Sequence, residues 1–445
     1  MASDLRQWLL ITSQREKESL LAKHVIHTDK IYAEFGPYSH AVRVGDMIFL
    51  HGAVGLDPSG RLPGSTPGRA DMAGQCAQTF DNLATALDLL GGSLQDVVKV
   101  RAFLPNHCRP SRDGQPSFDQ TFDATYRDYF RPPHPARAAL QHSLFQEDLL
   151  VEVEAVAIVN QAKQLITSDA LPPLRRPYAQ GGIRVGDLLF LRGFTSQNQH
   201  GELVGRGDMR AQTEQTFANM AITLDEAGGS LADLVQTQVT LTDYHSYSAY
   251  NEVFNRQVRE PFPTRTTFQG GLGGPGLLIE IESIAALGGS RLTIDSATPQ
   301  PGRSILQRRD DVIYAAELPP GSASYANGVR VGDLMFTAGQ VGVDAQRNLV
   351  GSGDIRAQTR QVLDTIRTIL RLADLDMNDI VKTTVMLSDW RDYEGYNEVY
   401  QTYFSPPYPA RSTTGGGLVR QGALIEIDAI AVAGARDTAT VLTHT

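Results

Sequence analysis

Cysteine is scarce in this sequence, with 2 residues among 445, and so few exclude a disulfide framework. Cys76 and Cys108 also form no Cys-x-x-Cys pair, and this usage predicts a reducing compartment and a cytoplasmic protein. Long apolar runs are missing near the start as well. The first twenty residues hold only WLLI at 8–11, which is too short for a signal-peptide core or a membrane span. We therefore expect no membrane partner.

Positive charge is in deficit, because 40 Lys and Arg face 50 Asp and Glu and leave a formal charge of −10. No basic tract offsets this deficit, so the sequence disfavours a nucleic-acid partner. The 10 histidines show no His-x-x-x-His or Cys/His spacing typical of a metal site. The glycine run at 270–276 does not follow a strand and open a helix, as phosphate-binding loops do. We expect neither a metal nor an organic cofactor.

What the sequence does contain is a threefold repeat. The segment VRVGDMIFLHG returns as IRVGDLLFLRG and again as VRVGDLMFTAG. Each copy continues with a helical pattern, a Pro-x-Arg turn and a strand that carries glutamate, so the period indicates whole domains. We predict the following segments: an N-terminal extension over 1–23, repeats 1, 2 and 3 over 24–160, 174–288 and 305–436, and polar linkers at about 161–174 and 288–305.

One spacing is constant across the copies. From the turn arginine to the strand glutamate there are 15 positions in every repeat. Other spacings differ because repeat 1 carries two insertions, near LPGSTPGR and PNHCRPSRDGQPS, whose Pro, Gly and Ser are typical of loops. The constant pairs are Arg137 with Glu152, Arg265 with Glu280, and Arg411 with Glu426.

Hydrophobic periodicity predicts an α+β domain for each copy. VRVGDLMFTAG indicates two short strands around a Gly-Asp turn, and residues 359–373 have the apolar spacing of an amphipathic helix. Residues 379–389 favour a strand, and residues 392–404 favour a second helix that ends before a proline pair. The last strand alternates with period two, which in repeat 2 places Glu280 and Glu282 on one face.

Two carboxylates on a strand otherwise suited to a core need a partner, because burying an unpaired carboxylate is costly. The turn arginine is the candidate, since two strands joined by a loop of fifteen residues can bring their ends together. Two interpretations stay open. The pair is either an ion pair that pins a hairpin or part of a site that binds a ligand.

The order of motifs resembles the Rid (reactive intermediate deaminase, or YjgF-like) family over most of the chain. The motifs are Gly-Pro-Tyr, a strand, Ala-Gly-Gln, a helix, Asn-x-x-Tyr, Pro-Ala-Arg-Ser and the glutamate strand. The resemblance implies the homotrimeric, chorismate-mutase-like fold of that family, with sheets lining an inner barrel, helices outside and one site at each subunit interface. Three tandem α+β domains would then form a single-chain pseudo-trimer that is monomeric.

The resemblance also implies an activity. Family members hydrolyse 2-imino and enamine acids such as 2-aminoacrylate to a 2-oxo acid and ammonia without a cofactor, and three fused copies are free to specialise to one pathway. Two alternatives remain: a module that binds a small 2-oxo acid without turnover, and a ribonuclease, which the acidic charge disfavours.

Site residues follow from the resemblance copy by copy. The arginine would bind the substrate carboxylate, the glutamate would hold water, and tyrosine, glycine and asparagine would line the site. Repeat 1 departs from the pattern with Asp123 in place of asparagine, and we expect the site that uses it to be silent. The residue before the glycine is His51, Arg192 or Ala338. The predicted site residues are Arg137, Arg265, Arg411, Glu152, Glu280, Glu426, Tyr38, Tyr178, Tyr325, Gly52, Gly193, Gly339, Asn251 and Asn397.

Overall fold

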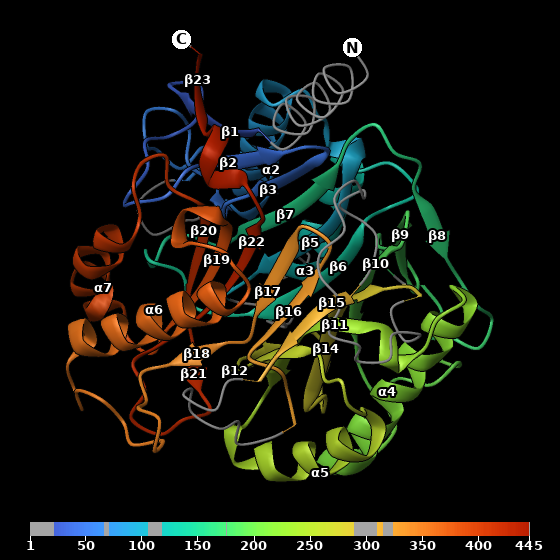
Figure 1. Cartoon of the computed structure of the whole chain (residues 1–445). Helices are drawn as coiled ribbons and strands as arrows, with labels where there is room; N and C mark the ends of the chain where they lie inside the picture. Colours follow the sequence, from blue (N-terminus) through green and yellow to red (C-terminus); the bar gives the residue numbers. More distant parts are fainter. Residues whose placement is uncertain are drawn as a thin grey trace, which may run out of the picture.

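The computed structural model describes residues 22–65, 71–105, 118–174, 176–288, 309–314 and 324–444 (Figure 1). Most of the expected N-terminal extension, parts of both insertions of repeat 1 and most of the second expected linker lie outside these ranges. Within them, the colours of Figure 1 separate repeat 1 in blue and teal, repeat 2 in green and repeat 3 in orange and red.

Repeat 1 contains a strand, a hairpin and two helices that alternate with further strands. Its elements are β1 (Lys23–Thr28), β2 (Ala41–Val44), β3 (Met47–Leu50), β4 (Ala53–Val54), α2 (Met72–Leu89), η1 (Leu94–Asp96), β5 (Val97–Phe103), α3 (Phe118–Tyr129), β6 (Ala136–Gln141) and β7 (Glu152–Ile158).

Repeats 2 and 3 repeat this order. In repeat 2 the elements are β8 (Gln164–Ile166), β9 (Gly182–Val185), β10 (Leu188–Phe194), α4 (Met209–Glu226), η2 (Leu231–Asp233), β11 (Leu234–Leu241), η3 (Tyr244–Ser246), α5 (Tyr247–Gln257), β12 (Thr264–Gln269), β13 (Gly271–Leu272) and β14 (Ile279–Ala286). In repeat 3 they are β15 (Arg309–Ile313), β16 (Gly328–Val331), β17 (Leu334–Thr337), β18 (Gln340–Val341), α6 (Ile355–Leu372), η5 (Met377–Asp379), β19 (Ile380–Leu387), η6 (Trp390–Asp392), α7 (Tyr393–Tyr400), η7 (Gln401–Tyr403), β20 (Ala410–Gly415), β21 (Gly417–Leu418), β22 (Ile425–Val432), η8 (Ala435–Thr438) and β23 (Thr440–His444).

The expected Gly-Asp turns are present. Gly45, Gly186 and Gly332 have φ angles of 58°, 57° and 58°, a left-handed conformation that glycine adopts without a steric penalty. The expected strands and helices of repeat 3 are also confirmed as β16, β17, α6, β19 and α7.

The first expected linker is wrong in part. Residues 164–166 form β8, which pairs antiparallel with β9 and is the edge strand of the sheet of repeat 2. Three residues in a polar segment are too few to show a strand period. The repeat boundaries themselves stay predictions.

Each repeat supplies most strands of one sheet, and two of the three sheets also include strands from other repeats. The strand orders are β13-β6-β5-β7-β3-β2-β1-β23, with β4 on β7; β21-β12-β11-β14-β10-β9-β8; and β15-β16-β17-β22-β19-β20, with β18 on β22. In every sheet the strand that follows the first long helix lies between the arginine strand and the glutamate strand: β5, β11 and β19 respectively.

The repeats exchange short edge segments in a cyclic order. The β13 segment of repeat 2 pairs with β6 of repeat 1, and β21 of repeat 3 pairs with β12 of repeat 2. The loop of repeat 1 completes the cycle, because Ser143 and Gly415 exchange two backbone hydrogen bonds of 2.9 and 2.8 Å. Each repeat thus contacts both others through its backbone.

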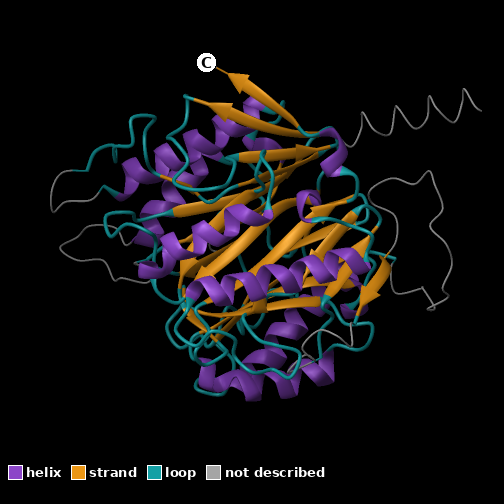
Figure 2. Ribbon diagram, turned by 60° about the vertical axis from the view of Figure 1, so that its left-hand side comes forward, coloured by secondary structure: helices purple, strands orange, loops and turns teal. Residues whose placement is uncertain are grey.

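Helices lie on the outside and sheets on the inside (Figure 2). One apolar cluster draws on all three repeats, with Val42 and Phe49, Ile183 and Phe190, and Val329 among its members. The three hydrogen-bonded sheets do not close into one barrel, so the expected inner barrel is corrected to three sheets that share this apolar cluster.

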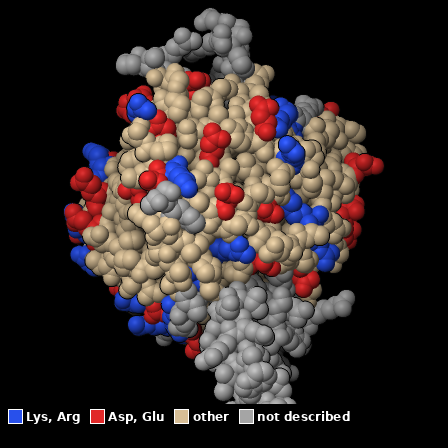
Figure 3. All heavy atoms as spheres, turned by 90° about the horizontal axis from the view of Figure 1, so that it is seen from above, with Lys and Arg blue, Asp and Glu red and all other residues tan. Residues whose placement is uncertain are grey.

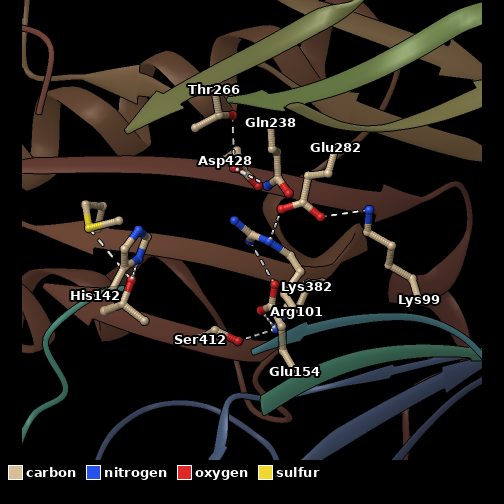
Figure 4. Close-up of polar contacts among 12 residues, drawn as sticks. Lys99, Arg101, His142, Glu154, Gln238, Thr266, Glu282, Lys382, Ser412 and Asp428 are labelled. Atoms are coloured by element: carbon tan, nitrogen blue, oxygen red, sulfur yellow. Dashed lines mark hydrogen bonds and ion pairs between the residues drawn. The ribbon is translucent and has the colours of Figure 1, made fainter. Parts of the chain in front are cut away.

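A buried polar network lies where the three sheets meet (Figure 4). Arg101 of repeat 1 donates to Glu282 of repeat 2 at 2.6 Å and to Glu154 at 2.9 Å. Lys99 contacts Glu282 and Lys382 contacts Glu154, both at 2.7 Å. Asp428 of repeat 3 accepts hydrogen bonds from two residues of repeat 2, Gln238 and Thr266, at 3.1 and 3.0 Å. The network therefore joins all three repeats.

The surface seen from above carries acidic and basic side chains interspersed, not gathered by sign (Figure 3). Within the described ranges, every helix is too short or too polar to cross a lipid bilayer.

Candidate active site

Within one repeat the arginine and the glutamate do not meet. Both β20 and β22 pair with β19, so they lie two strands apart and form no hairpin with each other. Arg411 is opposite Thr383, whereas Glu426 is opposite Met386, three residues further along. The expectation that the fifteen-residue loop joins neighbouring strands is wrong, because β19 is inserted between them.

Each arginine instead faces the next repeat. The guanidinium carbon of Arg411 lies 5.2 Å from the centre of the Tyr38 ring, and the Gly52 N–H donates to the Arg411 carbonyl at 3.1 Å. Arg411 and Glu152 line one pocket. The site is therefore built from repeats 3 and 1, and we call it the Arg411–Glu152 site.

The other two sites follow the same cycle. Arg265 lies 5.2 Å from the Tyr325 ring, and its carbonyl accepts from the Gly339 N–H at 3.2 Å, which forms the Arg265–Glu426 site from repeats 2 and 3. Arg137 lies 5.2 Å from the Tyr178 ring, which forms the Arg137–Glu280 site from repeats 1 and 2. The sequence spacing paired each arginine with the glutamate of its own repeat, whereas the structure brings it close to the glutamate of the next repeat.

The glycines are required by close approach to the glutamates. A Cβ atom on Gly52, Gly193 or Gly339 would lie 1.9, 1.9 or 2.2 Å from the carboxyl oxygen of Glu152, Glu280 or Glu426. Real Cβ contacts are never so short, so any side chain there displaces the carboxyl group. In β10 the strand register shifts between Leu191 and Phe194, and this bulge holds Gly193 beside the glutamate.

Burial keeps the three glutamates protonated near neutral pH. Burial, helped by the second acidic residue two positions on, raises the pKa of Glu152, Glu280 and Glu426 to about 8. The neighbour Glu154 behaves differently: although it too is buried, Lys382 and Arg101 hold its pKa at about 2. The two carboxyl groups of one strand thus differ in charge, which suits one to proton transfer and the other to structure.

Among the residues that the structure describes, the hydrogen-bond partners of two of the arginines are uncharged side chains. Arg411 donates to Asn397 at 2.8 Å and to the Tyr393 hydroxyl at 3.3 Å. Arg265 donates to Asn251 at 2.9 Å and to Tyr247 at 2.7 Å. The asparagines hold the guanidinium in place, and its positive charge remains for an anion.

The third arginine is different. Arg137 donates to the Asp123 carboxylate at 2.7 Å, and both side chains are buried. Arg176 adds a second cation 3.7 Å from Asp123 and pairs with Asp119 at 2.8 Å. A carboxylate therefore lies beside Arg137 at the position where the other two arginines have a neutral asparagine, and it balances the charge of the guanidinium.

The unusual residues before the glycines pack beside the sites. His51 stacks on Tyr38 with ring centres 5.7 Å apart and contacts the buried His40 at 3.2 Å. Burial lowers the pKa of His51 well below its ordinary value, so its ring is neutral. Arg192 donates to the carbonyls of Gln180 and Gly193.

The pocket of the Arg411–Glu152 site includes residues that sequence reasoning missed. Tyr393 recurs as Tyr247, four residues before the asparagine in both repeats, so aligning the copies would have found it. The remaining lining residues that were not predicted lie outside the motifs quoted for the three repeats, so no feature of the sequence selected them. The lining residues are Tyr32, Phe35, Tyr38, Gly52, Val54, Phe145, Glu152, Trp390, Tyr393, Arg411 and Thr413. In the described part of the chain, no three His, Cys, Asp or Glu side chains group as ligands for a metal ion.

Comparison with known proteins agrees with the presence of three repeats. The family model described as Endoribonuclease L-PSP matches residues 28–159, 168–287 and 316–433. A RutC family protein of Pyrococcus horikoshii is 39% identical over 27% of this chain and 96% of its own length. The 2-iminobutanoate/2-iminopropanoate deaminase of mouse is 36% identical over 28% of this chain and 91% of its own length, and its human counterpart is 34% identical over 29% and 95%.

Among solved structures, RidA of the Antarctic bacterium Psychrobacter is 32% identical, with a TM-score of 0.26, over 27% of this chain and 98% of that chain. The curated relatives match over nearly their whole length, and each match spans about one repeat of this chain. Three matches in order cover most of the described chain. The chain therefore belongs to the Rid (L-PSP endoribonuclease) family and carries three copies of its domain in tandem.

Proposed function

We propose that this chain is a cofactor-free hydrolase that converts 2-imino and enamine acids to 2-oxo acids and ammonia. The observation that carries the proposal is a buried guanidinium without a counter-charge, facing a protonated carboxyl group across a pocket. Relatives named as 2-iminobutanoate/2-iminopropanoate deaminases support the reaction class.

In this proposal each residue has a defined role. Arg411 binds the substrate carboxylate through its planar fork, and Tyr38 covers the guanidinium. Glu152 gives its proton to the imine nitrogen, or to the terminal carbon of an enamine, and the resulting carboxylate accepts a proton from a water molecule that attacks C2. Ammonia leaves as the carbonyl forms, so one water is consumed for each ammonia released. Arg265, Tyr325 and Glu426 do the same in their site.

The three sites are unequal in this proposal. The Arg411–Glu152 and Arg265–Glu426 sites turn over, whereas Asp123 neutralises Arg137 and leaves the Arg137–Glu280 site silent. The constant spacing in the sequence paired Arg411 with Glu426. They belong to two sites, and both of these keep an asparagine beside the arginine.

The test is ammonia release from 2-iminopropanoate generated in the assay, with three single variants. Arg411→Ala and Arg265→Ala should each remove part of the activity, and the double variant should lower kcat/KM by about 100-fold or more, because a charge-assisted clamp contributes a few kcal/mol. Arg137→Ala should retain the rate of the unaltered chain. Loss of all turnover in Arg137→Ala alone would refute the ranking, and 2-oxobutanoate binding with no ammonia release would identify a binding module instead.

A further inference from the structure

The pocket of the Arg411–Glu152 site changes character from its closed end to its opening. Arg411, Glu152 and Tyr32 are buried at the closed end. Phe35 is 41% exposed, and Phe145 and Trp390 are half-buried, so these three rings surround the opening. The site thus has a polar end that suits a 2-imino acid group and an aromatic opening beyond it.

The rings at the opening are held by both repeats. Phe35 and Phe145 of repeat 1 have ring centres 5.0 Å apart, and Phe35 also stacks on Tyr32 at 5.6 Å. Trp390 of repeat 3 donates its indole N–H to Ser143 at 2.9 Å, which ties it to the loop that carries Phe145. Together the three rings offer a ligand an apolar surface at the edge of the pocket, of the kind that lines small-molecule sites.

The other two sites have a different residue at this loop position. Eight residues after the arginine, repeat 1 has Phe145, repeat 2 has Gly273 and repeat 3 has Val419. These loops serve the Arg411–Glu152, Arg137–Glu280 and Arg265–Glu426 sites respectively, because each lies before the glutamate of that site. The aromatic loop is therefore specific to one site.

We propose that the Arg411–Glu152 site takes a 2-imino acid with a planar aromatic side chain, a substrate class that rests on the proposed function. The carboxylate binds Arg411, the imine carbon lies at Glu152, and the side-chain ring lies among Phe35, Phe145 and Trp390. Of the described residues that line the pocket, Arg411 and Glu152 are the charged ones, so the opening favours an apolar group over a charged one. Ring–ring contacts of this kind favour an aromatic substrate by about tenfold.

The experiment isolates this site in the Arg265→Ala chain. The imines of L-phenylalanine and L-alanine are generated in the assay by an amino-acid oxidase, and kcat/KM is measured for each. We expect a ratio that favours the aromatic imine, and we expect Phe145→Val, which installs the residue of repeat 3, to lower that ratio about tenfold. The matched control is Val419→Phe in the Arg411→Ala chain, which should raise the same ratio at the Arg265–Glu426 site.

A binding measurement distinguishes failure of the aromatic substrate class from failure of the proposed hydrolase function. Calorimetry with phenylpyruvate and pyruvate uses stable 2-oxo acids as probes. Tighter binding of phenylpyruvate that Phe145→Val abolishes, without ammonia release from either imine, would support the aromatic site and overturn the hydrolase. Hydrolysis of both imines with a ratio that Phe145→Val leaves unchanged would overturn the aromatic site and leave the hydrolase standing.

Discussion

At the scale of single residues, one substitution separates the three sites. Asn251 and Asn397 hold their arginines as neutral acceptors, whereas Asp123 brings a full negative charge to Arg137. Removing that charge while keeping the shape should free the guanidinium for an anion. We predict that Asp123→Asn raises the stoichiometry of 2-oxobutanoate binding from two to three per chain, measured by calorimetry.

The reverse exchange is the control. Asn397→Asp should place a carboxylate beside Arg411 and lower the stoichiometry from two to one, because an internal anion then competes with the ligand. Three equivalents in the unaltered chain, or no change in either variant, would show that Asp123 does not silence its site.

The buried glutamates predict how stability depends on pH. The pKa of Glu152 rises from 4.5 to about 8 on folding, so the folded chain holds this proton more tightly than the unfolded chain. Its contribution to stability is fully present below about pH 4.5 and is lost as the pH rises through 8. We predict that between pH 5 and pH 9 the melting temperature of Glu152→Gln falls less than that of the unaltered chain, by roughly 3 °C or more.

The same change at an exposed position controls for the charge alone. Glu147 lies exposed in the same loop region, and Glu147→Gln should follow the unaltered chain at both pH values. Parallel curves for Glu152→Gln and the unaltered chain would contradict a raised pKa at Glu152.

The sequence predicted which residues would form the site, but it paired each arginine with the wrong glutamate. Constant spacing singled out Arg411 and Glu426, because both the loop and the strands between them keep their lengths. That spacing fits two adjacent strands and two strands separated by a third equally well. The pairing of β19 with both β20 and β22 shows that the arginine strand and the glutamate strand are not adjacent. Aromatic residues such as Phe35 lie in segments that differ among the copies, so comparison of the repeats gave no signal for them.

At the scale of elements, the three long helices begin differently. The side-chain carboxylates of Asp208 before α4 and Asp354 before α6 each accept hydrogen bonds from two backbone N–H groups of the first turn. The side-chain carboxylate of Asp71 before α2 makes no such capping bond. We predict that Asp208→Ala and Asp354→Ala each lower the free energy of unfolding by about 1 kcal/mol, and Asp71→Ala by a few tenths at most. Urea midpoints measure the difference, and equal losses at all three positions would contradict it.

Helices and strands could be predicted from the sequence where the hydrophobic pattern continues over many residues. The amphipathic spacing of α6 extends over five turns, and Gly332 marks the turn of the β16–β17 hairpin. Both the helix and the hairpin were therefore predictable. The edge segments β13 and β21 were not, because two residues in a glycine-rich loop form a strand only against a neighbouring repeat. Contacts between repeats leave no local pattern.

At the scale of the whole molecule, the buried network holds the repeats together. Arg101 bridges Glu154 and Glu282, and its removal leaves two buried carboxylates short of a cation. We predict that Arg101→Ala lowers the free energy of unfolding by about 3–5 kcal/mol. Arg210→Ala removes an exposed pair with Glu252 and should leave the urea midpoint unchanged. Equal effects would mean that the network contributes no more than a surface pair.

The cyclic exchange of edge segments predicts the assembly. Each repeat already contacts both others within the described part of the chain, so we expect these interfaces to be filled within one chain. We predict sedimentation at the mass of one chain, 48.5 kDa. A stable particle of three chains would show that repeats pair between chains instead.

The polar network also bears on how the copies can change over time. In a ring of identical subunits every substitution is made three times, so a central arginine would arrive as three arginines. Here Lys99, Arg101 and Lys382 balance Glu154, Glu282 and Asp428, and repeat 2 has the neutral Gln238 where repeat 1 has Arg101. Three copies of repeat 1 would bring six cations against three carboxylates to one buried place. At this network the three repeats therefore supply different charges, and one repeat cannot take the place of another without leaving the buried charges unbalanced.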